Sequence, residues 1–160
     1  MKPETPLIYI HNDHWIDIID KSSFSNLSYG YASELIQEED NGTWYSSDGF
    51  AWKLKKRNKK FKDTTFNRFF ANLINKRYPV ETTWTKIKNY DLSELKKSII
   101  ECIKKDDDIL TQFIPGDLFI SKINEANTFL DLKEIICKYS FEVEDEEAIW
   151  EELEKLGLME

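Results

Sequence analysis

Long hydrophobic runs and cysteines are both scarce in this sequence of 160 residues. The longest unbroken apolar run is Leu7–Ile10, whereas a membrane-spanning helix needs about 20 residues. The run is also too short for the apolar region of a signal peptide. The two cysteines, Cys102 and Cys137, are too few for a disulfide framework. We therefore expect a soluble, cytoplasmic protein that does not contact membranes.

Glycine-rich enzyme motifs are missing as well. The five glycines stand singly, so no Gly-x-Gly-x-x-Gly, Walker or Gly-x-Ser-x-Gly pattern exists. The only histidines, His11 and His14, allow a metal site together with Asp17, but two surface histidines beside a helix cap are the favoured interpretation. Neither cysteine has a histidine as a sequence neighbour, and each is expected to be a small buried hydrophobe. We expect no enzymatic activity, no cofactor and no metal.

The hydrophobic content is sufficient for a folded core, because 41% of the residues are hydrophobic and 14% aromatic. No Pro/Gly/Ser-rich stretch divides the chain, so residues 1–160 are expected to form a single domain. Apolar residues recur mostly at helical spacing. Helices are expected over Asp63–Arg77 and from Asp91, Thr128 and Asp145 onward, with shorter ones at Asp13–Asp20, Leu27–Gln37, Asp107–Phe113 and Asp117–Asn124.

A β-hairpin is expected near residues 43–54, where two aromatic-rich segments flank Asp48-Gly49. Trp44 and Phe50 are expected on the same face of this hairpin. Trp15 is expected on the apolar face of a helix, whereas the hairpin aromatics are better candidates for exposure. The sequence thus predicts a mainly α fold: one compact helical domain with a small β-hairpin.

The charge is negative and unevenly distributed. Thirty acidic and 22 basic residues give a net charge of −8, and residues 81–160 hold 20 of the acids against 10 bases. A basic partner would be attracted to this second half, whereas nucleic acids and anionic membranes would be repelled. No direct contact with nucleic acid is therefore expected.

Acidic residues gather in two clusters of the second half. Neither has the spacing of a calcium-binding EF-hand loop, and residues 106–108 lie where a helix is expected to start, which favours helix capping over metal binding. Tryptophan and tyrosine are the residues most often found at interface hot spots. The candidate partner-binding residues are Asp106, Asp107, Asp108, Glu142, Glu144, Asp145, Glu146, Glu147, Trp44, Tyr45 and Trp52.

One basic segment contrasts with the negative net charge of the chain. Residues 53–62 hold seven positive charges, with Phe50, Trp52 and Phe61 close by in sequence. Basic residues interleaved with aromatics are typical of surfaces that bind single-stranded nucleic acid. The opposing interpretation is a solvated strand and loop that contacts the acidic half of the same molecule. A nucleic-acid-binding module that uses residues 53–62 is therefore the alternative function.

The sequence resembles the immunity proteins of bacterial contact-dependent growth inhibition and related polymorphic toxin systems. The segments that carry the likeness are Tyr9-Ile10 with Trp15-Ile16-Asp17, the stretch Gly42–Gly49, and the run Asp63–Phe70. Small size and acidity add to it. The resemblance implies a protein that binds the C-terminal domain of a cognate toxin, often a nuclease, and blocks its active site.

Overall fold

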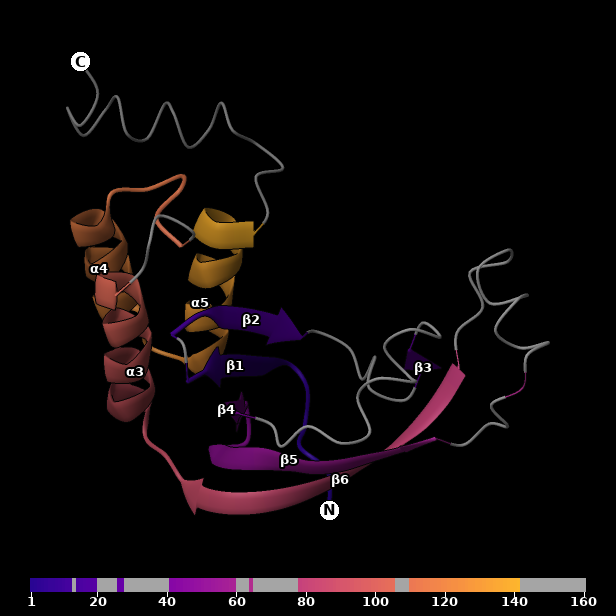
Figure 1. Ribbon diagram of the computed structural model, residues 1–160. Coiled ribbons are helices and arrows are strands. Elements are labelled where there is room, and N and C mark those ends of the chain that lie inside the picture. The colour runs from indigo at the N-terminus through magenta and orange to yellow at the C-terminus, as the bar shows by residue number, and fades with distance from the viewer. Residues whose placement is uncertain are drawn as a thin grey trace. The chain divides into compact units, whose positions relative to one another are not determined.

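The computed structural model describes residues 1–12, 14–19, 26–27, 41–59, 64, 78–105 and 110–141. The chain divides into two compact units (Figure 1). The sheet unit comprises residues 1–12 and 17–90, and the helical unit comprises residues 13–16 and 91–160.

Among the described residues, six strands form one sheet in the order β2-β1-β4-β5-β6-β3. The pairs β1–β4, β4–β5, β5–β6 and β3–β6 are antiparallel. The strands are β1 (Leu7–His11), β2 (Ile16–Ile19), β3 (Asn26–Leu27), β4 (Gly42–Ser46), β5 (Phe50–Lys59) and β6 (Tyr78–Asn89). The prediction of a mainly α fold is therefore wrong: the hairpin is part of a larger sheet.

Non-local pairing explains this error. The strand β1 pairs with β4, more than 30 residues further along the chain, so no short sequence window contains both partners. The 12-residue strand β6 does show strand periodicity, because Thr82 and Trp84 are buried while Glu81 and Thr83 are exposed. This alternation of β-branched and aromatic residues is the signal that the helical interpretation missed.

Aromatic side chains form the core on one face of the sheet. The register places Trp44 of β4 between Tyr9 of β1 and Trp52 of β5. Tyr9 stacks on Trp44 with ring centroids 4.1 Å apart, and Trp84 meets Trp44 edge-on at 5.4 Å. A Cβ atom at Gly42 would overlap the ring of Tyr9, so the stack requires glycine there.

The β4–β5 hairpin is confirmed. Gly49 adopts a φ of +81°, a conformation that favours glycine, and its N–H donates to the carbonyl of Ser46 at 3.1 Å. Phe50 packs against the core cluster that contains Trp44, so the expectation that these two rings share a face is also confirmed.

The helical unit contains α3 (Leu92–Lys105), α4 (Gly116–Glu125), α5 (Phe129–Ile136) and the π-helical turn η2 (Cys137–Phe141). The predicted start at Asp91 is confirmed, because the carboxylate accepts a hydrogen bond from the Glu94 N–H at 2.7 Å. The start at Thr128 is confirmed by a capping box with Asp131. The helix α4 confirms the prediction over residues 117–124.

Other helix predictions are wrong or untested. Residues 16–19 of the predicted helix 13–20 form the strand β2, and residues 110–113 of the predicted helix 107–113 form turns and bends. The first helix fails because His14 has a φ of +67°, which is incompatible with a right-handed helix. The predictions for residues 63–77, 28–37 and 145 onward lie outside the described residues, except for Thr64, which has no regular secondary structure. Leu27, the first residue of the predicted helix 27–37, lies in β3 instead.

Within the described part of the chain, no helix is long and apolar enough to cross a bilayer.

Candidate functional site

The hairpin aromatics are buried. The exposed fractions of Trp44, Tyr45 and Trp52 are 5%, 7% and 1%, so the expectation of exposure is wrong. Neighbouring residues on a strand point to opposite faces, so the burial of both Trp44 and Tyr45 means that both faces of β4 are covered. In the folded chain these rings are buried against the faces of the sheet.

A hydrogen-bonded corner lies at the β4–β5 turn. The hydroxyl of Ser46 accepts the indole N–H of Trp52 at 2.9 Å and also contacts the carboxylate of Asp48 and, at 3.0 Å, the Phe50 carbonyl. The hydroxyl of Tyr90 donates to the Ser46 carbonyl at 2.6 Å. Because these partners occupy the Ser46 hydroxyl, which is fully buried, its role here is structural rather than nucleophilic.

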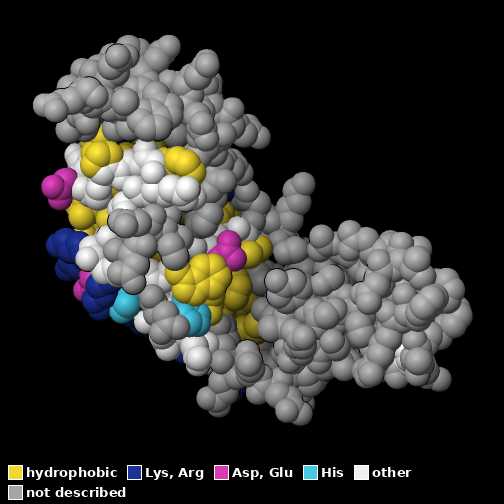
Figure 2. Space-filling model, turned by 45° about the horizontal axis from the view of Figure 1, so that its top comes forward, with side chains coloured by type: hydrophobic (Ala, Val, Ile, Leu, Met, Phe, Trp, Pro, Cys, Tyr) yellow, Lys and Arg dark blue, Asp and Glu magenta, His cyan; other side chains and the backbone are white. Residues whose placement is uncertain are grey.

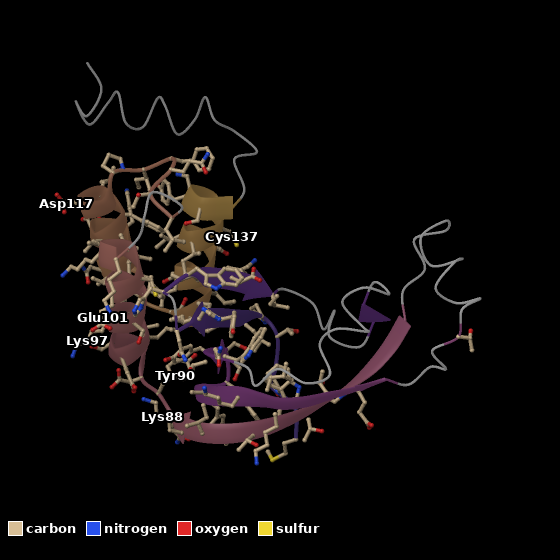
Figure 3. The ribbon with its side chains drawn as sticks, viewed as in Figure 1. Lys88, Tyr90, Lys97, Glu101, Asp117 and Cys137 are labelled. Carbon is tan, nitrogen blue, oxygen red and sulfur yellow. The ribbon has the colours of Figure 1, made fainter. Side chains whose placement is uncertain are left out.

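Tyr90 closes this corner from the end of β6 (Figure 3). Its N–H donates to the Gly49 carbonyl at 3.1 Å, and its ring meets the edge of Tyr45 with centroids 5.0 Å apart. Burial raises the pKa of the Tyr90 hydroxyl above its usual value, and Asp48 and Tyr45 raise it further. The neutral phenol, which can donate the hydrogen bond, is therefore favoured.

The predicted acidic contacts lie outside the described residues. This applies to all eight carboxylates, Asp106, Asp107, Asp108, Glu142, Glu144, Asp145, Glu146 and Glu147. Their positions in the sequence are nevertheless informative: the first three follow α3 directly, and the others follow η2. Both clusters belong to the helical unit.

The two units carry charges of opposite sign. The sheet unit has 14 basic and 10 acidic residues, and the helical unit has 8 basic and 20 acidic residues. Within the helical unit, the described residues hold seven acids and seven bases, such as Lys97 and Glu101 one turn apart on α3 (Figure 3). On the face drawn in Figure 2, both acidic and basic side chains occur among the described residues. The negative excess therefore comes entirely from the rest of that unit, which has 13 acids and one base.

An exposed tryptophan lies in the segment of the helical unit that joins β1 to β2. Trp15 is 44% exposed, so its predicted place on a buried helix face is wrong. The preceding residue, His14, accepts a hydrogen bond at Nε2 from the Lys105 ammonium, 3.0 Å away, since an ammonium can only donate. This bond ties the segment to the last turn of α3. The sequence signal that was missed is the polar run Asn12–His14, which favours a loop.

The remaining candidates are the two cysteines, a metal site and the basic segment. Cys102 and Cys137 are buried, as expected, and neither forms a disulfide. Among the described residues, no group of three or more histidine, cysteine, aspartate or glutamate side chains is arranged to hold a metal ion. Most of the basic segment, residues 53–59, belongs to β5 and pairs with β6.

The chain matches no protein-family model, no curated protein and no solved structure in the three comparisons made with it.

Proposed function

We propose that this protein is an immunity protein that binds and blocks a basic toxin domain, the C-terminal nuclease domain of a contact-dependent growth inhibition type toxin. The observation that carries the proposal is the concentration of negative charge in the helical unit, where 13 acids stand against one base outside the described residues. The resemblance of the sequence to immunity proteins supports the same function.

Charge complementarity is the physical basis of this proposal. A nuclease binds phosphates and is therefore basic near its active site. A protein that presents carboxylates is attracted to that cleft and competes with the substrate for it. Electrostatic steering raises association rates to roughly 10⁸–10⁹ M⁻¹s⁻¹ at low salt. Fast capture matters because a free nuclease acts repeatedly on its substrate.

The proposed contact surface consists of the acids at 106–108 and 142–147 together with Trp15. Trp15 replaces the hairpin aromatics as the aromatic contact, because it is exposed and belongs to the acidic unit. Tryptophan is enriched among interface hot spots. The carboxylates would act mainly on the rate of encounter, and the ring of Trp15 on the rate of dissociation.

Co-expression with the protein encoded directly upstream tests this function. We expect that protein to arrest bacterial growth alone, and growth to recover when this chain is present. A stable 1:1 complex of the two purified proteins should form and should lack the nuclease activity of the upstream protein. Growth arrest that persists in the presence of soluble, folded chain, with no complex in size-exclusion chromatography, would contradict the proposal.

A further inference from the structure

A two-stranded ribbon extends the sheet at β5 and β6. These strands pair from Phe50 opposite Asn89 to Lys59 opposite Val80, whereas the register of β4 with β5 comprises only Ala51 and Trp52 (Figure 1). The ribbon contains two register shifts, between Ala51 and Trp52 and between Leu54 and Lys56. Such bulges increase the right-handed twist of paired strands.

The ribbon is strongly basic. Residues 53–59 and 81–88 together contain seven basic residues and one acid, Glu81. Lys55 stands at the second register shift with an exposed side chain. The side chains of Lys86 and Lys88 on β6 are exposed too. Positive charge therefore runs along both strands of the ribbon.

Among the described side chains of the ribbon, the aromatics are not available to stack on bases. Trp52 and Trp84 are at least nine-tenths buried in the core, and the ammonium of Lys86 lies 2.8 Å from the centroid of the Phe50 ring. Binding of single strands relies on exposed aromatic platforms. A basic two-stranded ribbon whose described aromatic side chains are covered instead matches a duplex, whose major groove admits a two-stranded ribbon and whose phosphates line its edges.

We propose that the β5–β6 ribbon binds double-stranded nucleic acid through its phosphate backbone, without sequence preference. This surface goes beyond the proposed immunity function and is carried by the other unit of the chain. The negative net charge led us to expect no contact with nucleic acid. That argument does not hold for the sheet unit, whose own balance is 14 bases against 10 acids.

Fluorescence anisotropy with a labelled 20-base-pair DNA duplex of mixed sequence tests the ribbon. The purified full-length chain should bind with a Kd on the order of 10⁻⁴–10⁻⁶ M near physiological salt, the range of non-specific binding. A triple variant, Lys55→Gln, Lys56→Gln and Lys59→Gln, should bind at least about tenfold more weakly, with a shallower salt dependence.

A matched variant provides the control. The changes Lys2→Gln, Lys97→Gln and Lys104→Gln remove the same charge from exposed positions outside the ribbon and should leave the affinity within about twofold of the wild type. Circular dichroism verifies that each variant is folded. Equal weakening in both variants, or no binding by the wild type at 50 mM salt, would overturn the proposal.

Two further ligands test whether the ribbon prefers a single strand or an acidic polypeptide to a duplex. A labelled 20-nucleotide single strand should bind no more tightly than the duplex, and tighter binding would overturn the preference for a duplex. Poly-L-glutamate should displace the duplex only at a higher charge concentration than unlabelled duplex does. Displacement at a lower concentration would show that the ribbon fits an acidic polypeptide instead. None of these measurements involves the toxin, so their failure leaves the immunity proposal untouched.

Discussion

The hydroxyl of Tyr90 donates a hydrogen bond to the carbonyl oxygen of Ser46, which lies 44 residues earlier in the chain. The two oxygen atoms are 2.6 Å apart. Tyr90 is also the last residue of the sheet unit, and Asp91, the N-cap of α3, is the next residue of the helical unit. The β4–β5 turn thus holds the end of β6 in place directly before the chain enters the helical unit. This contact gives the first test of the fold.

Replacing Tyr90 with phenylalanine should reduce the free energy of unfolding by about 0.5–1.5 kcal/mol at pH 7, because the Ser46 carbonyl loses one of its two donors and keeps only the Gly49 N–H. The pKa of Tyr90 is raised in the folded state, mainly by burial. Its contribution is therefore complete below the unfolded pKa of about 10 and is lost as the pH rises above it. Urea unfolding between pH 8 and pH 11 should show a smaller alkaline loss in the variant. Parallel pH profiles would show that the phenol does not remain neutral.

Truncation to alanine should reduce the free energy of unfolding much more at Trp52 than at Trp15. Trp52 is 1% exposed and packs in the aromatic core, so Trp52→Ala should cost about 3–5 kcal/mol of unfolding free energy. Trp15 is 44% exposed, so Trp15→Ala should cost clearly less, about 1–2 kcal/mol. Chemical denaturation followed by circular dichroism measures both. A loss for Trp15→Ala as large as that for Trp52→Ala would refute the assignment of Trp15 to the surface.

The start of α5 depends on the capping box. The hydroxyl of Thr128 accepts the Asp131 N–H at 3.1 Å, so Thr128→Ala should destabilise the protein by about 0.5–2 kcal/mol. Hydrogen bonds from the N–H of Asn127, and then from Thr128, lower the pKa of the Asp131 carboxyl. Its stabilising contribution is present above pH 3.8 and is lost as the pH falls further. Asp131→Asn should therefore show less acid destabilisation than the wild type in thermal melts from pH 5 to pH 2.5.

Local signals in the sequence predicted local structure well. The caps at Asp91 and Thr128 and the Asp48-Gly49 turn were found because the residues that form them lie within four positions of each other. The sheet was missed because its pairs join distant segments, such as Leu7 with Ser46. Hydrophobic periodicity in a short window cannot identify a distant partner strand.

The burial of the candidate site residues likewise depends on segments that are distant in the sequence. The hairpin aromatics are predicted as candidates for exposure, whereas Tyr45 and Trp44 are buried on opposite faces of a larger sheet that no local pattern reveals. The prediction of Trp15 on an apolar helix face fails because the residues around it form a loop and the strand β2. The segregation of charge was visible in the sequence, but its coincidence with a structural boundary at residues 90 and 91 was not.

The central claim is that the acids concentrated outside the described helices capture a basic partner. Surface plasmon resonance against the upstream-encoded protein, inactivated by mutation, tests it with two quadruple variants of equal charge. One replaces Glu144, Asp145, Glu146 and Glu147 by Gln or Asn, and the control replaces Glu101, Asp117, Glu125 and Glu134, which are exposed on α3, α4 and α5.

The first variant should associate at least about tenfold more slowly at 50 mM salt, with a smaller change in the dissociation rate, and the difference should shrink at 0.5 M salt. The control should keep the wild-type association rate within about threefold. Equal association rates for the two variants at 50 mM salt would contradict the claim that the acids at 144–147 guide the partner.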